Sequence, residues 1–191
     1  MSRKLILLLS AVFAVLPVIG AEQRLATVDM ARVFREYYRT AQVEAELKKQ
    51  AGVFRNYVLE QEAAVRKLED QFKKQRDIFQ SIAFDEKQKS AARQEAEKIA
   101  ARIQSTNAEK EAYVTEKNRS MAALGQQRRN EILADITREV TRQAQAGGYS
   151  FVFDTAGLSA NNVPVVVYST PAVDLTDAVI KTLNLGRPAG H

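Results

Sequence analysis

The side chains that could carry out covalent or acid–base chemistry are few in this chain. Cysteine is absent, and the single histidine is His191, the last residue of the sequence. The sequence therefore offers no thiol nucleophile, and we expect no imidazole base and no histidine metal site. A glycine-rich pattern that could cradle phosphate groups is also missing. These observations argue against an enzyme, and we expect no cofactor and no metal.

Two carboxylates, Asp29 and Asp154, are the remaining candidates for shared chemistry. Each follows a short apolar segment that is typical of a β-strand, Leu25–Val28 and Tyr149–Phe153. A carboxylate directly after a strand is also a common cap of the next helix or turn. We therefore interpret Asp29 as a helix cap and Asp154 as a turn residue.

Residues 1–21 are typical of a secretion signal. Arg3 and Lys4 form a short positive region, Leu5–Leu16 is apolar, and Ala21 is a small residue at the expected cleavage point. The apolar run is shorter than the roughly 20 residues that a transmembrane helix needs. We predict cleavage before Glu22 and export; the alternative is an uncleaved membrane anchor.

The chain is mildly basic, with a formal net charge of +5 and a pI of about 9.5. Removing Arg3 and Lys4 from the 28 basic residues leaves 26 against 23 acidic ones, a net charge of +3. For an exported protein we expect contact with anionic lipid, lipopolysaccharide or anionic client proteins, and no nucleic acid partner.

A charged, proline-free stretch of more than a hundred residues, 30–146, dominates the chain. Ordinary globular helices run roughly 8–20 residues, so we predict a long coiled-coil arm that folds back on itself. Apolar residues recur every seven positions, as the a and d positions of a coiled coil do. The predicted seam positions are Ala51, Val58, Val65, Phe72 and Phe79, with the partner series Leu47, Phe54, Gln61, Leu68, Gln75 and Ile82.

The repeat ends at Ser81–Glu86, where we place the turn, with the tip of the arm near 81–88. Ser81 or Asp85 could cap the returning helix. Apolar residues also recur along the return helix, but the polar residues Thr106 and Lys110 fall on its expected seam. We therefore predict a loose hairpin whose two helices touch only in places.

The remaining residues, 22–29 and 147–191, predict a small β-rich body. Gly147-Gly148 is expected to end the return helix, Val163–Tyr168 to form a further strand, and Leu175–Leu185 to form a helix capped by Asp174. The fold class is therefore α+β, with a long antiparallel helical hairpin projecting from this body. Because so small a body is marginal alone, we expect an oligomer. Its predicted shared core contains Phe151, Phe153, Val165 and Val167.

The chain resembles the Skp/OmpH family of periplasmic chaperones over nearly the whole predicted mature sequence. The segments that carry the resemblance are Ala26–Met30, Val33–Tyr38, Tyr149–Asp154 and Val173–Asn184. The order of signal, strand, long hairpin, two strands and capped helix is more specific than any single segment.

The resemblance implies a periplasmic homotrimer whose helical arms enclose a cavity for unfolded outer-membrane β-barrel proteins, held without ATP. We assign diffuse client contacts to the outer half of the arm. They are Phe72, Phe79, Phe84, Lys67, Lys73 and Lys74. For the lysines, a solvated helix face is the alternative interpretation. For the whole protein, the alternative is a structural coiled-coil spacer or scaffold of the cell envelope, with a rigid seam and one dedicated partner.

Overall fold

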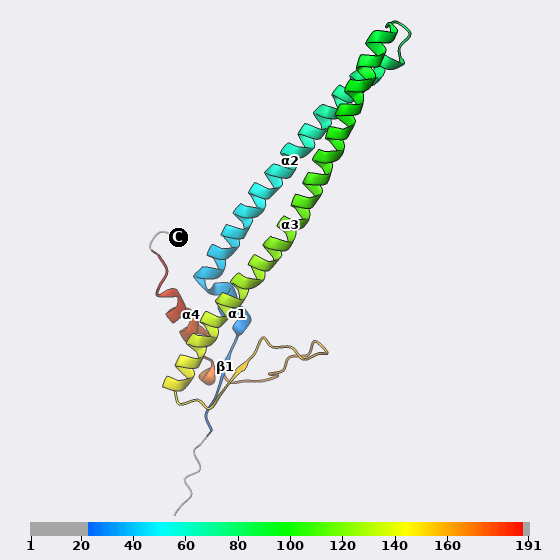
Figure 1. Ribbon diagram of the computed structural model, residues 1–191. Helices are drawn as coiled ribbons and strands as arrows, with labels where there is room; N and C mark the ends of the chain where they lie inside the picture. Colours follow the sequence, from blue (N-terminus) through cyan, green and yellow to red (C-terminus); the bar gives the residue numbers. More distant parts are fainter. Residues whose placement is uncertain (1–22, 189–191) are drawn as a thin grey trace, which may run out of the picture.

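The structure, a computed structural model, describes residues 23–188; the predicted secretion signal and His191 lie outside this range. Two long helices, α2 and α3, form an antiparallel pair that projects from a small body (Figure 1). This arrangement confirms the predicted α+β hairpin on a small body. The elements are β1 Leu25–Val28, α1 Met30–Glu36, α2 Tyr38–Gln80, α3 Glu86–Ala146, β2 Phe151–Asp154, η1 Pro171–Val173 and α4 Thr176–Asn184.

The arm is built as the heptad pattern predicts. α2 has 43 residues and α3 has 61, which gives lengths of roughly 65 and 90 Å at 1.5 Å per residue. The predicted seam positions of α2 from Leu47 to Phe79 are all half-buried or buried, whereas Ile82, at the tip, is 100% exposed. On the facing side of α3, Ala92, Ala96 and Ile99 are buried. The side chains of Ala92 and Ala96 are small, so they permit a close approach of the facing helix.

The tip of the arm contains the predicted turn, and Asp85 is the N-cap of α3. Its side chain accepts a hydrogen bond from the Gln88 N–H at 2.8 Å, and the Gln88 side chain accepts one from the Asp85 N–H at 3.1 Å. This reciprocal capping box satisfies two of the free N–H groups of the helix terminus. The other predicted cap, Ser81, instead accepts a hydrogen bond from the Ala83 N–H inside the turn.

The charged stretch predicted a long helix that begins near Met30, but the structure interrupts this helix after its first 7 residues. α1 ends at Glu36, Tyr37 has extended backbone angles (φ −73°, ψ 123°), and α2 begins at Tyr38. Neither glycine nor proline marks this break. Tyr37 is 6% exposed and packs in the core of the body, so tertiary packing outweighs the local helix preference.

The sheet within residues 23–188 has two strands, β1 and β2, which pair in parallel with Leu25 opposite Phe151. Parallel strands need a long crossover connection, and here the whole arm provides it. The predicted strand Val163–Tyr168 is not formed. Two of its N–H groups bond the neighbouring loop, Val165 to the Gly157 carbonyl and Val163 to the Ser159 hydroxyl. An isolated antiparallel bridge joins Pro164 to Leu158, but Pro164 offers no N–H that could extend it. The segment thus has the composition of a strand, but within residues 23–188 no named strand pairs with it.

The core lies at the base of the arm, where α1, α3 and α4 meet. α3 ends at Ala146, and Gly148 adopts the left-handed conformation (φ 67°) that was expected after this helix. The helix predicted at Leu175–Leu185 is α4. The buried core residues are Val28, Val33, Tyr37, Ile132, Ile136, Val140 and Val179.

Candidate functional site

The two carboxylates that could have shared chemistry bind backbone N–H groups. Asp29 accepts a hydrogen bond from the Arg32 N–H at 2.7 Å and is the N-cap of α1. Asp154 accepts from the Met30 N–H at 3.1 Å and from the Ala156 N–H at 2.9 Å. Their interpretation as cap and turn residues is confirmed. Within residues 23–188 no group of three or more potential acidic, cysteine or histidine ligands is placed to hold a metal ion.

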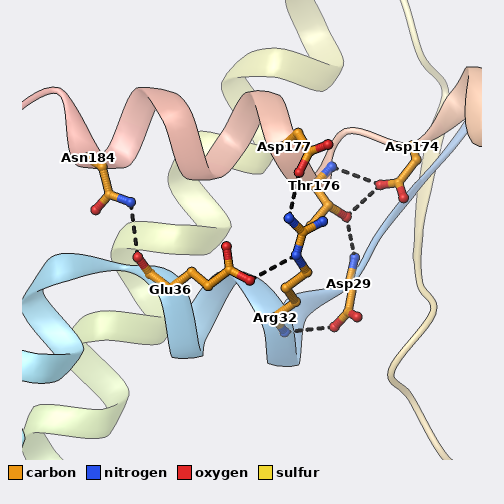
Figure 2. Close-up of polar contacts among 7 residues, drawn as sticks. All are labelled: Asp29, Arg32, Glu36, Asp174, Thr176, Asp177 and Asn184. Carbon is orange, nitrogen blue, oxygen red and sulfur yellow. Dashed lines mark hydrogen bonds and ion pairs between the residues drawn. The ribbon is translucent and has the colours of Figure 1, made fainter.

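A polar network fastens the start of α4 to the start of α1 (Figure 2). The Thr176 hydroxyl oxygen accepts a hydrogen bond from the Asp29 N–H at 2.8 Å, and Asp174 in turn accepts from the Thr176 N–H. The Arg32 guanidinium bridges Glu36 at 2.9 Å and Asp177 at 2.8 Å. The predicted cap Asp174 therefore binds the first residue of α4 and helps to lock that helix onto the body.

The residues predicted for a shared oligomer core are exposed in the single chain. Because side chains alternate along a strand, Val152 of β2 faces the body while Phe151 and Phe153 face outward and are 53% and 45% exposed. Val165 and Val167 are 62% and 86% exposed. These four residues thus lie outside the core of their own chain.

An open apolar hollow of about 640 Å³ lies beside the outer face of the sheet. Phe153, Val165 and Val167 line it, and so do Leu25 and Tyr168, which are themselves 48% and 83% exposed. We call these five residues the body face. All five side chains are at least 45% exposed, so the body face presents apolar surface outside the core of its own chain.

The structure does not gather the predicted client contacts into one site. Lys67, Lys73 and Lys74 are exposed along α2, whereas Phe72 and Phe79 are half-buried in the seam. Phe84 lies in the tip, where it is 37% exposed. The Arg93 guanidinium lies 5.8 Å from the centre of the Phe79 ring. The outer arm therefore combines exposed positive charge with aromatic rings that are only partly available.

Sequence reasoning missed an aromatic groove in the half of the arm nearer the body. The Tyr113 ring centre on α3 lies 4.2 Å from that of Tyr57 and 6.0 Å from that of Phe54. An open groove of about 420 Å³ runs beside this cluster, and Val53 and Lys117 help to line it. Phe54 was a predicted seam position, but Tyr57 lies off both heptad series, so the pattern alone could not have found the cluster.

The shifted pKa values belong to structural groups at the base of the arm. Burial raises the pKa of the Tyr37 phenol above its ordinary value. A hydrogen bond from Arg142 lowers the pKa of Glu139, and Gln143 donates a further bond to this carboxylate at 2.7 Å. Both groups lie where α3 joins the body. No helix within residues 23–188 has the length and apolar character to cross a membrane.

Comparisons with known proteins show the family and the fold of this chain. The family model described as "Outer membrane protein (OmpH-like)" matches residues 24–183. A crystal structure from Caulobacter crescentus CB15, of a protein provisionally described as an OmpH-like outer membrane chaperone, matches with a TM-score of 0.68. The match covers 86% of each chain at 16% sequence identity, so it shows a shared fold. No curated protein sequence matches this one. Because the family model spans most of the sequence, the chain belongs to the OmpH family.

Proposed function

We propose that this protein is an ATP-independent periplasmic holdase chaperone that binds unfolded outer-membrane β-barrel proteins and prevents their aggregation. The observation that carries the proposal is the long arm, whose 43- and 61-residue helices project from a small body. Membership of the OmpH family supports it, as does the description of the C. crescentus protein as an outer membrane chaperone.

The proposed binding site is a cavity between the arms of a homotrimer. One arm cannot enclose a client, so the function requires several arms held side by side. The exposed body face, centred on Phe153 and Val167, supports association through the body. Burying this apolar surface would supply the hydrophobic stabilisation that a two-stranded sheet lacks.

The surface of the arm suits a client that has no fixed shape. α2 carries exposed lysines, such as Lys67 and Lys73, as well as accessible apolar side chains, including Val53 at 65% and Leu59 at 52%. Each contact of this kind is weak, but many weak contacts to one tethered chain act together. In this proposal the client is held by such diffuse contacts, and contact with anionic lipid or lipopolysaccharide would use the same positive charge.

The proposed location is the periplasm, reached through cleavage of the predicted secretion signal. A protein without cysteine needs no disulfide to fold in that oxidising compartment. The alternative, an envelope spacer or scaffold, would need a stiff and continuously packed seam. Gln61 and Gln75 on the seam of α2 argue against it.

The test is light scattering of a denatured outer-membrane β-barrel protein diluted into buffer with the mature protein, in the absence of ATP. We expect aggregation to be suppressed at about one trimer per client, with the mass of the complex measured in parallel by multi-angle scattering. Lysozyme at equal mass is the inert control. A stable oligomer that leaves aggregation unchanged would contradict the holdase and favour the spacer.

A further inference from the structure

The break between α1 and α2 leaves backbone groups without helical partners. A helix cannot bond its last carbonyls or its first N–H groups internally, so a break in mid-helix needs outside partners. Tyr37 is extended between the two helices, with Glu36 ending α1 and Tyr38 beginning α2. α3, the other helix of the arm, continues from the tip to Ala146 without interruption.

One side chain from a distant part of the sequence bonds both sides of this break. The Asn184 amide nitrogen donates a hydrogen bond to the Glu36 carbonyl at 3.0 Å, and its oxygen accepts one from the Tyr38 N–H at 2.9 Å. Figure 2 shows Asn184 at the end of α4 reaching the end of α1. An amide can do both because it carries a donor and an acceptor, whereas aspartate offers only acceptors and leucine offers neither.

A further hydrogen bond crosses the break between two residues close together in the sequence. The Thr40 hydroxyl in the first turn of α2 donates to the Phe34 carbonyl in α1 at 2.6 Å, and Thr40 is 5% exposed. The direction in which α2 leaves α1 is thus held by one local bond and by two bonds from α4.

α4 is in turn fixed to the body, so the hydrogen bonds from Asn184 come from a helix that is itself held in place. Its first residue, Thr176, binds the Asp29 N–H, and Asp177 pairs with Arg32. Val179 in its middle is fully buried in the core. α1 is therefore held by α4 at both ends, and the polar contacts of Figure 2 connect the body to the point where the arm begins.

We infer that Asn184 is a positioning residue for α2: it bonds both sides of the Tyr37 break and so, together with the uninterrupted α3, sets the angle at which the arm leaves the body. A small rotation at this point is amplified along the arm. Ala64 lies roughly 40 Å along α2 from the break at 1.5 Å per residue, so a 10° rotation would move it by about 7 Å. The inference concerns the geometry of the arm and holds whatever the arm binds.

The test measures the distance between the arm and the body with spin labels. The chain contains no cysteine, so Ala64→Cys on α2 and Ala178→Cys on α4, both exposed positions, carry the only labels. Labelled chain is diluted into unlabelled chain so that each oligomer holds one labelled pair. We expect a narrow distance distribution in the parent protein, and a shift or broadening of several ångström in Asn184→Ala.

Matched variants separate positioning from general loss of stability. Lys181→Ala, on the exposed side of α4, should leave the distribution unchanged. Ile132→Val removes one methylene group from the core, which should lower the melting temperature but not move the arm. An equal broadening in Ile132→Val would overturn the inference, since any loosening would then have the same effect.

The Thr40 bond provides a second route if Asn184→Ala fails to fold. Thr40→Val has nearly the same shape but cannot donate to Phe34, whereas Thr40→Ser keeps the hydroxyl. We expect Thr40→Val to broaden the distribution and Thr40→Ser to leave it unchanged. Unchanged distances in both Asn184→Ala and Thr40→Val would show that core packing alone directs the arm.

Discussion

Glu139 illustrates how single residues at the base of the arm are tied to one another. It lies on α3, and its carboxylate accepts hydrogen bonds from the Arg142 guanidinium at 2.8 and 2.6 Å. Gln143, which also donates a hydrogen bond to Glu139, donates another to the Thr182 hydroxyl on α4 at 3.3 Å. The hydrogen bond from Arg142 is the largest cause of the lowered Glu139 pKa. The stability of the packing between α3 and α4 around Glu139 should therefore depend on pH.

Because the pKa of Glu139 is lower in the folded protein than its ordinary 4.5, ionisation stabilises the fold above about pH 4.5, and this contribution is lost as the pH falls through the folded pKa. We expect Glu139→Gln to lower the melting temperature by a few degrees at neutral pH, and the difference from the parent to shrink as the pH falls below about 4.5. Thermal unfolding followed by circular dichroism from pH 3 to 8 measures both. Glu97→Gln, at an exposed position of α3, is the control. A difference that stays constant across this range would show that ionisation of Glu139 does not stabilise the fold.

Positive charge on α2 can also be tested at the level of single side chains. Lys67, Lys73 and Lys74 are exposed, so long-range attraction to anionic clients is screened by salt. We expect replacement of all three by glutamine to weaken client capture several-fold at low salt and to flatten its salt dependence. Replacement by arginine keeps the charge and should have little effect. Equal capture by the glutamine and arginine variants would assign the lysines to a solvated face.

At the scale of elements, the arm is a pair of helices held by a narrow seam. The burial of Ala92, Ala96 and Ile99 on α3 means that the helices approach closely in the outer half. Elsewhere the seam is more polar: Gln61 on α2 and Thr106 on α3 are only half-buried. The outer half of the arm should therefore be sensitive to the size of its small residues.

Ala96→Leu should overpack the seam at a cost of about 1–3 kcal/mol. Ala100→Leu introduces the same side chain one turn later at an exposed position of α3 and should cost little. Hydrogen exchange followed by mass spectrometry measures the opening of α2 and α3 in each variant. Similar exchange rates in the two variants would mean that the helices are not in close contact at Ala96.

At the scale of the whole molecule, one chain leaves its body face uncovered. Phe153, Val165 and Val167 are all at least 45% exposed, and the body has only two strands within residues 23–188. The single-chain core instead lies at the base of the arm, around Ile132 and Ile136. The body face is thus available for association without disturbing that core.

Phe153→Asp should abolish the proposed trimer but leave each chain folded, because a carboxylate buried without a partner at an interface costs several kcal/mol. The ring is 45% exposed in one chain, so the single-chain fold should tolerate the change. Sedimentation gives the mass and circular dichroism the helix content. Phe84→Asp, at the tip, should leave the mass unchanged. A Phe153→Asp protein with the parent's mass would exclude this face as the interface.

Local features of this protein followed from the sequence. The heptad spacing predicted which side of α2 is buried, and Asp29 and Asp85 were predicted as helix caps; the structure confirms both. These features depend on residues a few positions apart, where periodicity and capping act. The candidate client contacts Lys67 and Phe84 were likewise named from charge and spacing, and they stay predictions.

The tertiary structure alone decided how distant segments meet. The pairing of β1 with β2 and the hydrogen bonds from Asn184 across the Tyr37 break each join residues more than a hundred positions apart. No local pattern encodes such contacts. For the same reason the strand expected at Val163–Tyr168 failed, since alternation gives a segment the capacity to pair but only a neighbouring strand completes its hydrogen bonds. The sequence by itself determined the arm, and long-range contacts decided how that arm is joined to its body.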